Sequence, residues 1–172
     1  MEVARRQAPP DSAFLGDLRT FYYWDSHEAP LRRGDLAMHD LYLALFAHHP
    51  RWAKWLLVLR GVLVAPLGLR RTRMADLDGI EIKPAYEVGD KIARFTLIAQ
   101  SDDEIVTGAD DRHLDFRVSV RKLGVQGATH VALSTVVSPH NALGWAYLRA
   151  ILPFHRAGVR AILANAVAAG RI

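Results

Sequence analysis

Acidic and histidine side chains gather in residues 101–121, where Asp111, His113 and Asp115 occur at every second position. Residues two apart on a β-strand point to the same face and lie about 7 Å apart, so both carboxylates could reach the imidazole or a shared cation. A histidine oriented by a carboxylate is an effective general base near neutral pH. The alternative, which we favour, is a solvated face on which neighbouring arginines form ordinary ion pairs.

The alternation that places these residues on one face places apolar residues on the other. A strand is predicted over residues 111–123, and its apolar face carries Leu114, Phe116, Val118 and Val120. This face must be buried, so Phe116 is expected to face the interior and His113 and Asp115 the wet, convex side. Asp111 lies in a run, 110–112, that also has the composition of a hairpin turn.

Further candidates lie on and before a long predicted C-terminal helix. His140 and Asn141 stand at its start, where backbone N–H groups can hold an anion, although simple helix capping is favoured. Tyr147 and His155 lie two turns apart and would be rare polar groups in an apolar interior, either as hydrogen-bonded core residues or as ligand anchors. The residues predicted to contact a ligand are Phe116, His140, Asn141, Tyr147, Ile151, Phe154 and His155.

Several kinds of site are not supported by the sequence. The chain has no cysteine and no HExxH motif, and the adjacent His48 and His49 would not face each other on a helix. No serine lies in a GxSxG turn and no GxGxxG stretch is present. We therefore expect no metal, no nucleophilic triad and no cofactor.

The composition is that of one globular domain: 172 residues, of which 51% are hydrophobic. The absence of cysteine fits a reducing compartment, and we expect a cytoplasmic protein. Basic residues cluster between Arg51 and Arg73, beside Trp52 and Trp55. This cluster could contact an anionic membrane or nucleic acid, but the wet face of an amphipathic helix is favoured, and no nucleic-acid partner is expected. The longest apolar stretch, 52–69, is interrupted by charges, so stable membrane insertion is not expected.

Hydrophobic periodicity predicts the order strand, two helices, antiparallel strands, long helix. The strands are predicted at 18–28, 80–82, 91–100, 104–108, 111–123 and 129–137, and the helices at 36–47, 51–64 and from about 138–141 to 169. The last helix contains Pro153 and an apolar stripe formed by Leu143, Tyr147, Ile151, Phe154, Gly158 and Ile162. This order predicts an α+β helix-grip fold, in which a curved antiparallel sheet wraps a long C-terminal helix. Residues 1–13 are expected to be a flexible arm and residues 14–172 a single helix-grip domain.

Four stretches resemble a bacterial family known as domain of unknown function 2867: FYYWDSHEAPL, HHPRWAKWLLVLRGVLVAPLGL, DEIVTGADDRHLDFRVSV and STVVSPHNALGWAYLRAILPFHR. That family resembles the START/SRPBCC helix-grip superfamily, whose members enclose apolar ligands or carry out cyclisation and hydration chemistry. The resemblance implies a fold and an interior cavity, but no particular reaction. Some members of the family are fused behind a nucleotide-dependent reductase domain, which implies a role as a partner module.

Three functions therefore stay open. The leading hypothesis is a domain that binds a small apolar or amphipathic molecule between sheet and helix, in a cavity of at least about 300 Å³. The first rival is an enzyme of the same fold that uses a cavity histidine or carboxylate for proton transfer. The second rival is a non-catalytic partner module of a reductase. The sequence leaves open whether the chain forms a homodimer.

Overall fold

A computed structural model describes residues 3–5, 12, 21–47, 83–125 and 127–172 of the chain. Its centre is a seven-stranded antiparallel sheet with the order β1-β2-β7-β6-β5-β4-β3. The strands are β1 (Ala4–Arg5), β2 (Tyr23–Pro30), β3 (Lys91–Ile92), β4 (Phe95–Gln100), β5 (Glu104–Asp110), β6 (Leu114–Val125) and β7 (Ala128–Pro139). The helices are α1 (Met38–Phe46) and α3 (Ala142–Ala168).

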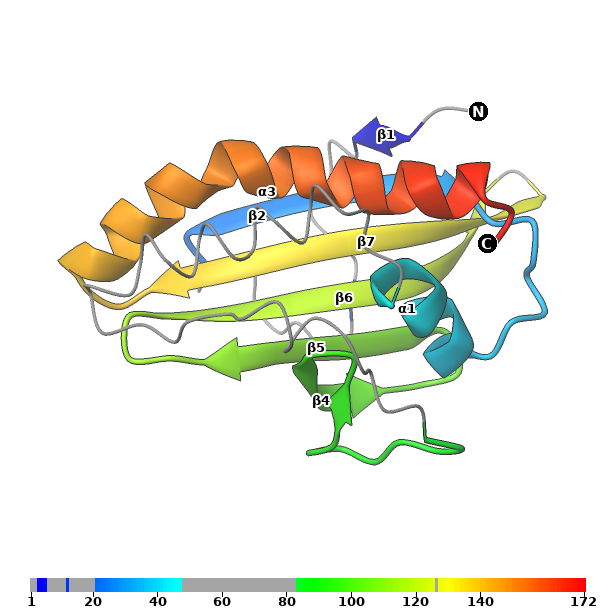
Figure 1. The fold of residues 1–172 in the computed structure, drawn as a ribbon, viewed down its shortest axis with the longest axis horizontal. Helices are drawn as coiled ribbons and strands as arrows, with labels where there is room; N and C mark the ends of the chain where they lie inside the picture. The colour runs from blue at the N-terminus through cyan, green and yellow to red at the C-terminus, as the bar shows by residue number, and fades with distance from the viewer. Residues whose placement is uncertain (1–2, 6–11, 13–20, 48–82, 126) are drawn as a thin grey trace.

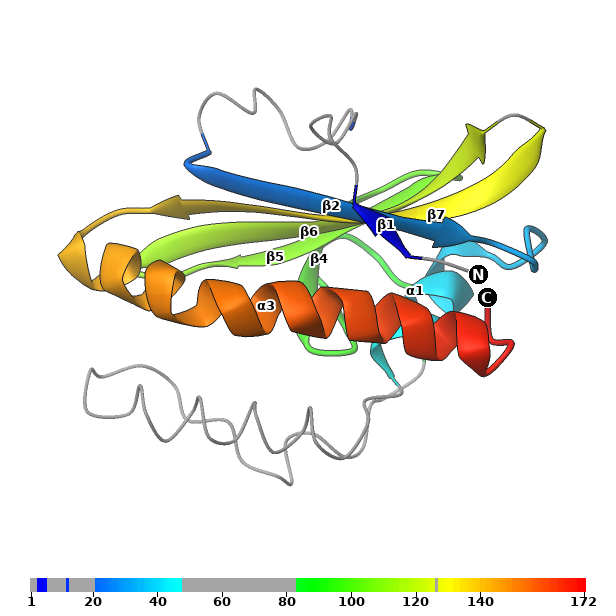
Figure 2. The same cartoon turned by 90° about the horizontal axis from the view of Figure 1, so that it is seen from above.

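The long helix α3 lies along one face of the twisted sheet, over β2 and β7 (Figures 1 and 2). The shorter helix α1 covers the same face beside the C-terminal part of α3 (Figure 1). This arrangement confirms the predicted α+β helix-grip fold. The predicted helix 51–64 and strand 80–82 lie outside the described residues, as do most of the predicted N-terminal arm and the basic cluster 51–73.

Part of that predicted arm is a strand. Ala4 pairs with Glu28 and Arg5 pairs with His27, so β1 forms one edge of the sheet beside β2. The predicted bounds of the flexible arm, 1–13, and of the domain, 14–172, stay predictions. Among the described residues, none of the helices is both long and apolar enough to cross a membrane.

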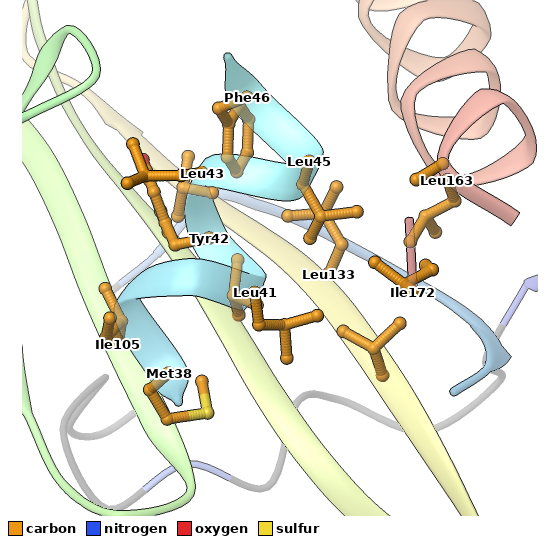
Figure 3. Close-up of a cluster of buried hydrophobic side chains, with 14 of the residues drawn as sticks. Met38, Leu41, Tyr42, Leu43, Leu45, Phe46, Ile105, Leu133, Leu163 and Ile172 are labelled. Carbon is orange, nitrogen blue, oxygen red and sulfur yellow. The ribbon is translucent and has the colours of Figure 1, made fainter. Parts of the chain in front are cut away.

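The tightest part of the core lies where α1 and the end of α3 meet the sheet. Leu41, Tyr42 and Leu45 of α1 are fully buried, together with Leu163 of α3 and the C-terminal Ile172. Figure 3 shows these side chains directed into one cluster above Leu133 of β7. Such packing anchors the C-terminal part of α3 mainly through apolar contact, to which Arg171 Nε adds a hydrogen bond to the backbone oxygen of Ala44 at 3.1 Å.

The ends of α3 follow the sequence prediction. Asn141 caps the helix because its side-chain oxygen accepts a hydrogen bond from the backbone N–H of Gly144, at 3.0 Å. Gly170 ends it with φ +62°, and the N–H of Arg171 donates to the carbonyl of Ala166 at 2.9 Å. This is a Schellman ending, in which glycine takes the left-handed conformation that other residues avoid.

The predicted apolar stripe on α3 is wrong: the residues that are buried lie about one position further along the chain than the predicted ones. The buried residues of α3 are Gly144, Leu148, Val159, Leu163 and Ala166. Phe154, predicted to face the interior, is 56% exposed. The helix carries alanine, leucine or another apolar residue on most of its circumference, so periodicity alone did not select the face that meets the sheet.

The predicted strand over 91–100 is also corrected. Ala93 has φ +54°, which breaks the segment into β3 and β4, and the register of β4 shifts between Leu97 and Ala99. The shift is a β-bulge, which turns the next residues to the other face. Leu97 therefore packs with α1 in the main core, whereas Ala99 packs against Val106 and Val136 on the opposite face.

The sheet face opposite the helices was predicted to be a solvated ionic surface. This prediction is wrong for the middle of that face, which is buried. Val106 and Val136 are fully buried there, and the buried hydroxyls of Ser26 and Ser134 are hydrogen-bonded at 2.8 Å. The expected ion pairs are confirmed nearer the strand ends, where Arg117 binds Asp110 at 2.5 Å and Arg121 binds Asp103 at 3.5 Å.

Candidate functional site

The candidate site lies between β2 and the middle of α3. Tyr23, Asp25 and His27 occur at every second position of β2, so they share the face that α3 covers. Asp25 has no exposed surface and His27 is only 2% exposed. A carboxylate and an imidazole thus lie inside an interface whose other members are mainly apolar.

Both oxygens of the Asp25 carboxylate are engaged. The Tyr23 hydroxyl donates a hydrogen bond to Oδ2 at 2.8 Å, and His155 Nε2 of α3 lies 3.3 Å from Oδ1. Arg156 Nε in turn donates to the Tyr23 hydroxyl oxygen at 3.3 Å. Burying a carboxylate is costly unless its oxygens find such partners, so this cluster links α3 to the sheet by polar contacts.

The electrostatics keep Asp25 ionised. Burial alone would raise the pKa of this carboxyl, but the hydrogen bond and the charge of His155, with smaller effects from Tyr23 and His27, hold it below its ordinary value. Burial raises the pKa of Tyr23 to about 12, against the opposing hydrogen bond from Arg156. Tyr23 therefore remains a neutral donor beside an anionic Asp25.

His155 consequently has a defined orientation toward Asp25. Because Asp25 is a carboxylate, the imidazole donates its Nε2 proton to it, and Nδ1 is the ring nitrogen outside this bond. The side chain of His155 is 25% exposed, whereas that of Asp25 is 1% exposed. The imidazole therefore lies in less enclosed surroundings than the carboxylate that orients it.

His27 extends the cluster toward the edge of the sheet. Its Nδ1 is buried and has no hydrogen-bond partner among the described residues. Burial is the main cause that lowers the pKa of His27; Asp25 opposes the shift, while Arg160, Arg5 and His155 add to it. His27 therefore feels the charges of one carboxylate and two guanidinium groups, and one of these, that of Arg5, belongs to its cross-strand partner.

The middle of α3 covers this cluster loosely. Every position of α3 is described, and between Leu148 and Val159 none is fully buried. A Cβ added to Gly158 would meet no atom within 4 Å. The helix is thus packed at both ends and less enclosed where it passes Asp25 and His155.

The predicted ligand-contacting residues are brought together only in part. His155 joins the Asp25 cluster, and Tyr147 packs edge-to-face on His113 with ring centroids 5.5 Å apart. Phe116 lies on the helix-facing side and contacts the ring of Phe95 at 5.3 Å. Ile151 is half-buried, and the exposed Phe154 points away from the interior. Whether these residues contact a ligand stays a prediction.

The residues first singled out as a possible catalytic set do not form one. Asp111 and His113 precede β6 in the hairpin turn instead of lying on the strand, and His113 is buried rather than solvated. The carboxylate of Asp115 binds His140 Nε2 at 3.0 Å. The N–H of His140 and the side-chain amide of Asn141 donate to carbonyl oxygens of the hairpin turn, so this region docks the start of α3 on the sheet.

Sequence reasoning missed Asp25, Tyr23 and His27. The strand containing them, YWDSHEAP, carries polar residues at both alternating sets of positions, so it has no apolar face to indicate which side is buried. Its pairing with β7 on one side and β1 on the other was the missing information. Among the described residues, no group of three or more His, Cys, Asp or Glu side chains could hold a metal ion.

Fold and site together define a helix-grip domain with a buried carboxylate–histidine–tyrosine cluster between its sheet and its long helix. The chain belongs to the family described as "Protein of unknown function (DUF2867)", whose model matches residues 18–162. No curated protein and no solved structure matches the chain. The family resemblance expected from the four sequence stretches is therefore confirmed.

Proposed function

We propose that this domain binds a small amphipathic molecule between the sheet and the middle of α3. The observation that carries the proposal is the buried Asp25 carboxylate, held by His155 and Tyr23 at the place where α3 is least enclosed. The polar group of the ligand would lie at the end of this polar cluster, and its apolar part would lie on the half-buried side chains of α3 and β6. The resemblance to START/SRPBCC proteins, many of which enclose apolar ligands, supports the same function.

A purely structural role is the competing explanation, since Asp25, His155 and Tyr23 satisfy one another. A structural link, however, does not require a partly exposed imidazole. The proposal therefore requires an interior pocket of at least about 300 Å³, the lower end for ligand sites.

The test is a ligand panel of fatty acids, sterols and aromatic polyketides, with thermal melting as the readout. A ligand that binds only the folded chain raises its melting temperature, and Asp25→Asn should abolish that rise. Asp115→Asn is the matched control, because Asp115 also pairs with a histidine but lies at the start of α3. The absence of any shift across the panel would contradict the proposal and leave an interaction role, such as that of a reductase partner.

A second candidate is catalysis of proton transfer, favoured by the contact of 3.3 Å through which the Asp25 carboxylate orients His155. Nδ1 of His155 would remove a proton from a carbon next to a carbonyl group, and the resulting imidazolium would be stabilised by Asp25. The same nitrogen would return the proton, so no further reactant is consumed. Incubation with a β-keto compound in D₂O should introduce deuterium at that carbon, and His155→Gln should abolish the exchange while binding persists.

A further inference from the structure

The seam between the β1–β2 edge and α3 carries an excess of positive charge. Arg5 pairs directly with His27 across the two strands, and cross-strand partners project from the same face of a sheet. On α3, Arg156 and Arg160 are one turn apart on the same side of the helix, and Arg156 contacts Tyr23. Three guanidinium groups, from Arg5, Arg156 and Arg160, therefore line one seam.

No second negative charge balances them there. Asp25 is the acidic residue of β2 on this face, and its two oxygens already accept hydrogen bonds from His155 and Tyr23. Glu28 is adjacent to His27 and so projects from the opposite face of the strand. The α3 segment, described throughout, contains no aspartate or glutamate, and within the described part of the chain Arg5 and Arg160 form no ion pair with a carboxylate.

His27 lies at the inner end of this seam with an unsatisfied polar atom. Its Nδ1 is buried without a hydrogen-bond partner among the described residues. A buried polar atom without a partner is unfavourable, so its presence in a folded protein calls for an explanation. A bound group that hydrogen-bonds the imidazole and neutralises the neighbouring guanidinium groups would supply one.

The geometry points to an anion site formed by His27, Arg5 and Arg160, which takes the negatively charged head group of an amphipathic ligand. This inference rests on the proposed function and deepens it by naming the ligand class: an apolar molecule that carries one negative charge, such as a long-chain carboxylate. The head group lies at the β1–β2 edge, where Arg5 and Arg160 are solvent-exposed. The apolar body extends from there under the middle of α3, past Asp25 and His155. Arginine suits this role because its planar guanidinium binds a carboxylate through two parallel hydrogen bonds.

The experiment compares two probes with the same apolar chain, dodecanoate and dodecan-1-ol, by calorimetric titration of the full chain at low ionic strength. Dodecanoate should bind about tenfold more tightly, because each of the two exposed charge pairs contributes up to about a factor of five. The double variant Arg5→Gln/Arg160→Gln should lose that difference and retain its affinity for the alcohol. Raising the salt concentration should also reduce the difference, since salt screens exposed charges.

Arg149→Gln is the matched control. Arg149 is also an exposed arginine of α3, but it lies eleven residues before Arg160, or about 16 Å along the helix axis. This variant should keep the preference for dodecanoate. Equal loss in Arg149→Gln and Arg160→Gln would overturn the anion site in favour of general electrostatic attraction.

A second readout reports on His27 itself. The charged and titratable groups that act on its pKa are Asp25, Arg160, Arg5 and His155. A bound carboxylate adds a negative charge and should raise the pKa of His27, which NMR titration of the imidazole resonances measures; dodecan-1-ol should not. Equal binding of both probes without this shift would overturn the anion site but leave the proposed function standing. Binding of neither probe, together with a silent ligand panel, would overturn both.

Discussion

The C-terminal third of α3 and its middle contact the same sheet by different means. Near the C-terminus, Leu163 and Ala166 have no exposed surface and pack with α1 and Ile172 in an apolar cluster. In the middle, the contact to β2 consists of the Asp25–His155–Tyr23 cluster, flanked by half-buried side chains and by a glycine with open space around it. Apolar side chains must fill the space between helix and sheet to stabilise their contact, whereas a hydrogen-bonded cluster requires only that a few polar atoms lie at the right distances and angles.

The difference teaches where function can reside in such a fold. An apolar anchor stabilises the helix on the sheet without leaving room or reactive groups. Once both ends of α3 are anchored, the middle can carry polar residues that contribute less to stability. Buried charges with defined partners in an otherwise apolar interior are a frequent feature of binding and catalytic sites.

The largest expected difference in stability between the two regions comes from truncating one leucine in each. Leu163→Ala should lower the free energy of unfolding by about 2–5 kcal/mol, because it leaves a cavity in the fully buried cluster. Leu152→Ala, in the half-buried middle of α3, should cost clearly less. Urea unfolding of both variants measures this, and equal losses would remove the distinction between the two regions.

Asp25→Asn should lower the free energy of unfolding by a smaller amount, about 1–3 kcal/mol, because it weakens the hydrogen bonds with His155 and Tyr23. The folded pKa of Asp25 lies below its ordinary value of 3.8, so its contribution is complete above that pH and is lost as pH falls through the lower, folded pKa. The difference in unfolding free energy between wild type and Asp25→Asn should therefore shrink below about pH 4.

The control for that pH dependence is Asp103→Asn. Asp103 also has a lowered pKa, caused first by the hydrogen bond from Ser101, but it is exposed. Its replacement should change stability by only about 0.5 kcal/mol at neutral pH. A pH-independent difference for Asp25→Asn would mean that the polar cluster does not stabilise the ionised carboxylate.

Replacing each of the two glycines of α3 by alanine should change the stability in opposite directions, which tests the difference in packing between the start and the middle of the helix. A Cβ at Gly144 would lie 1.9 Å from the backbone oxygen of His113, so Gly144→Ala should force the start of the helix off the hairpin turn and cost about 1–3 kcal/mol. Gly158→Ala meets open space and should stabilise the chain by about 0.5–1 kcal/mol through helix propensity. Thermal and urea unfolding measure both changes, and a destabilised Gly158→Ala would show that the middle of α3 is tightly packed.

Much of the architecture was predictable because it depends on short-range patterns. Alternation identified the inward residues of β6 and β7, and Asn141 and Gly170 marked the two ends of α3. These signals are local: a strand's faces alternate every residue, and a helix ends where backbone groups find a cap. The breaks within residues 91–100 were missed, since a bulge and a left-handed alanine leave no clear local pattern.

The site depended on relations between distant residues. His155 was recognised as a candidate from the sequence, but its partner Asp25 lies 130 residues earlier, in a strand with polar residues on both faces. The sequence also left the orientation of α3 undetermined. This helix carries apolar side chains on most of its circumference, so the face that is buried depends on which elements pack against it.

By itself, the sequence determined the order of the elements, the helix-grip class, the faces of the long hairpin and the ends of the last helix. Only the tertiary structure decided that β2 lies between β1 and β7 beneath α3, and hence that Asp25 is buried against His155 and that His27 lies opposite Arg5. The physical reason is that backbone periodicity and capping act over a few residues, whereas burial and pairing of charged groups depend on which distant surfaces are brought into contact.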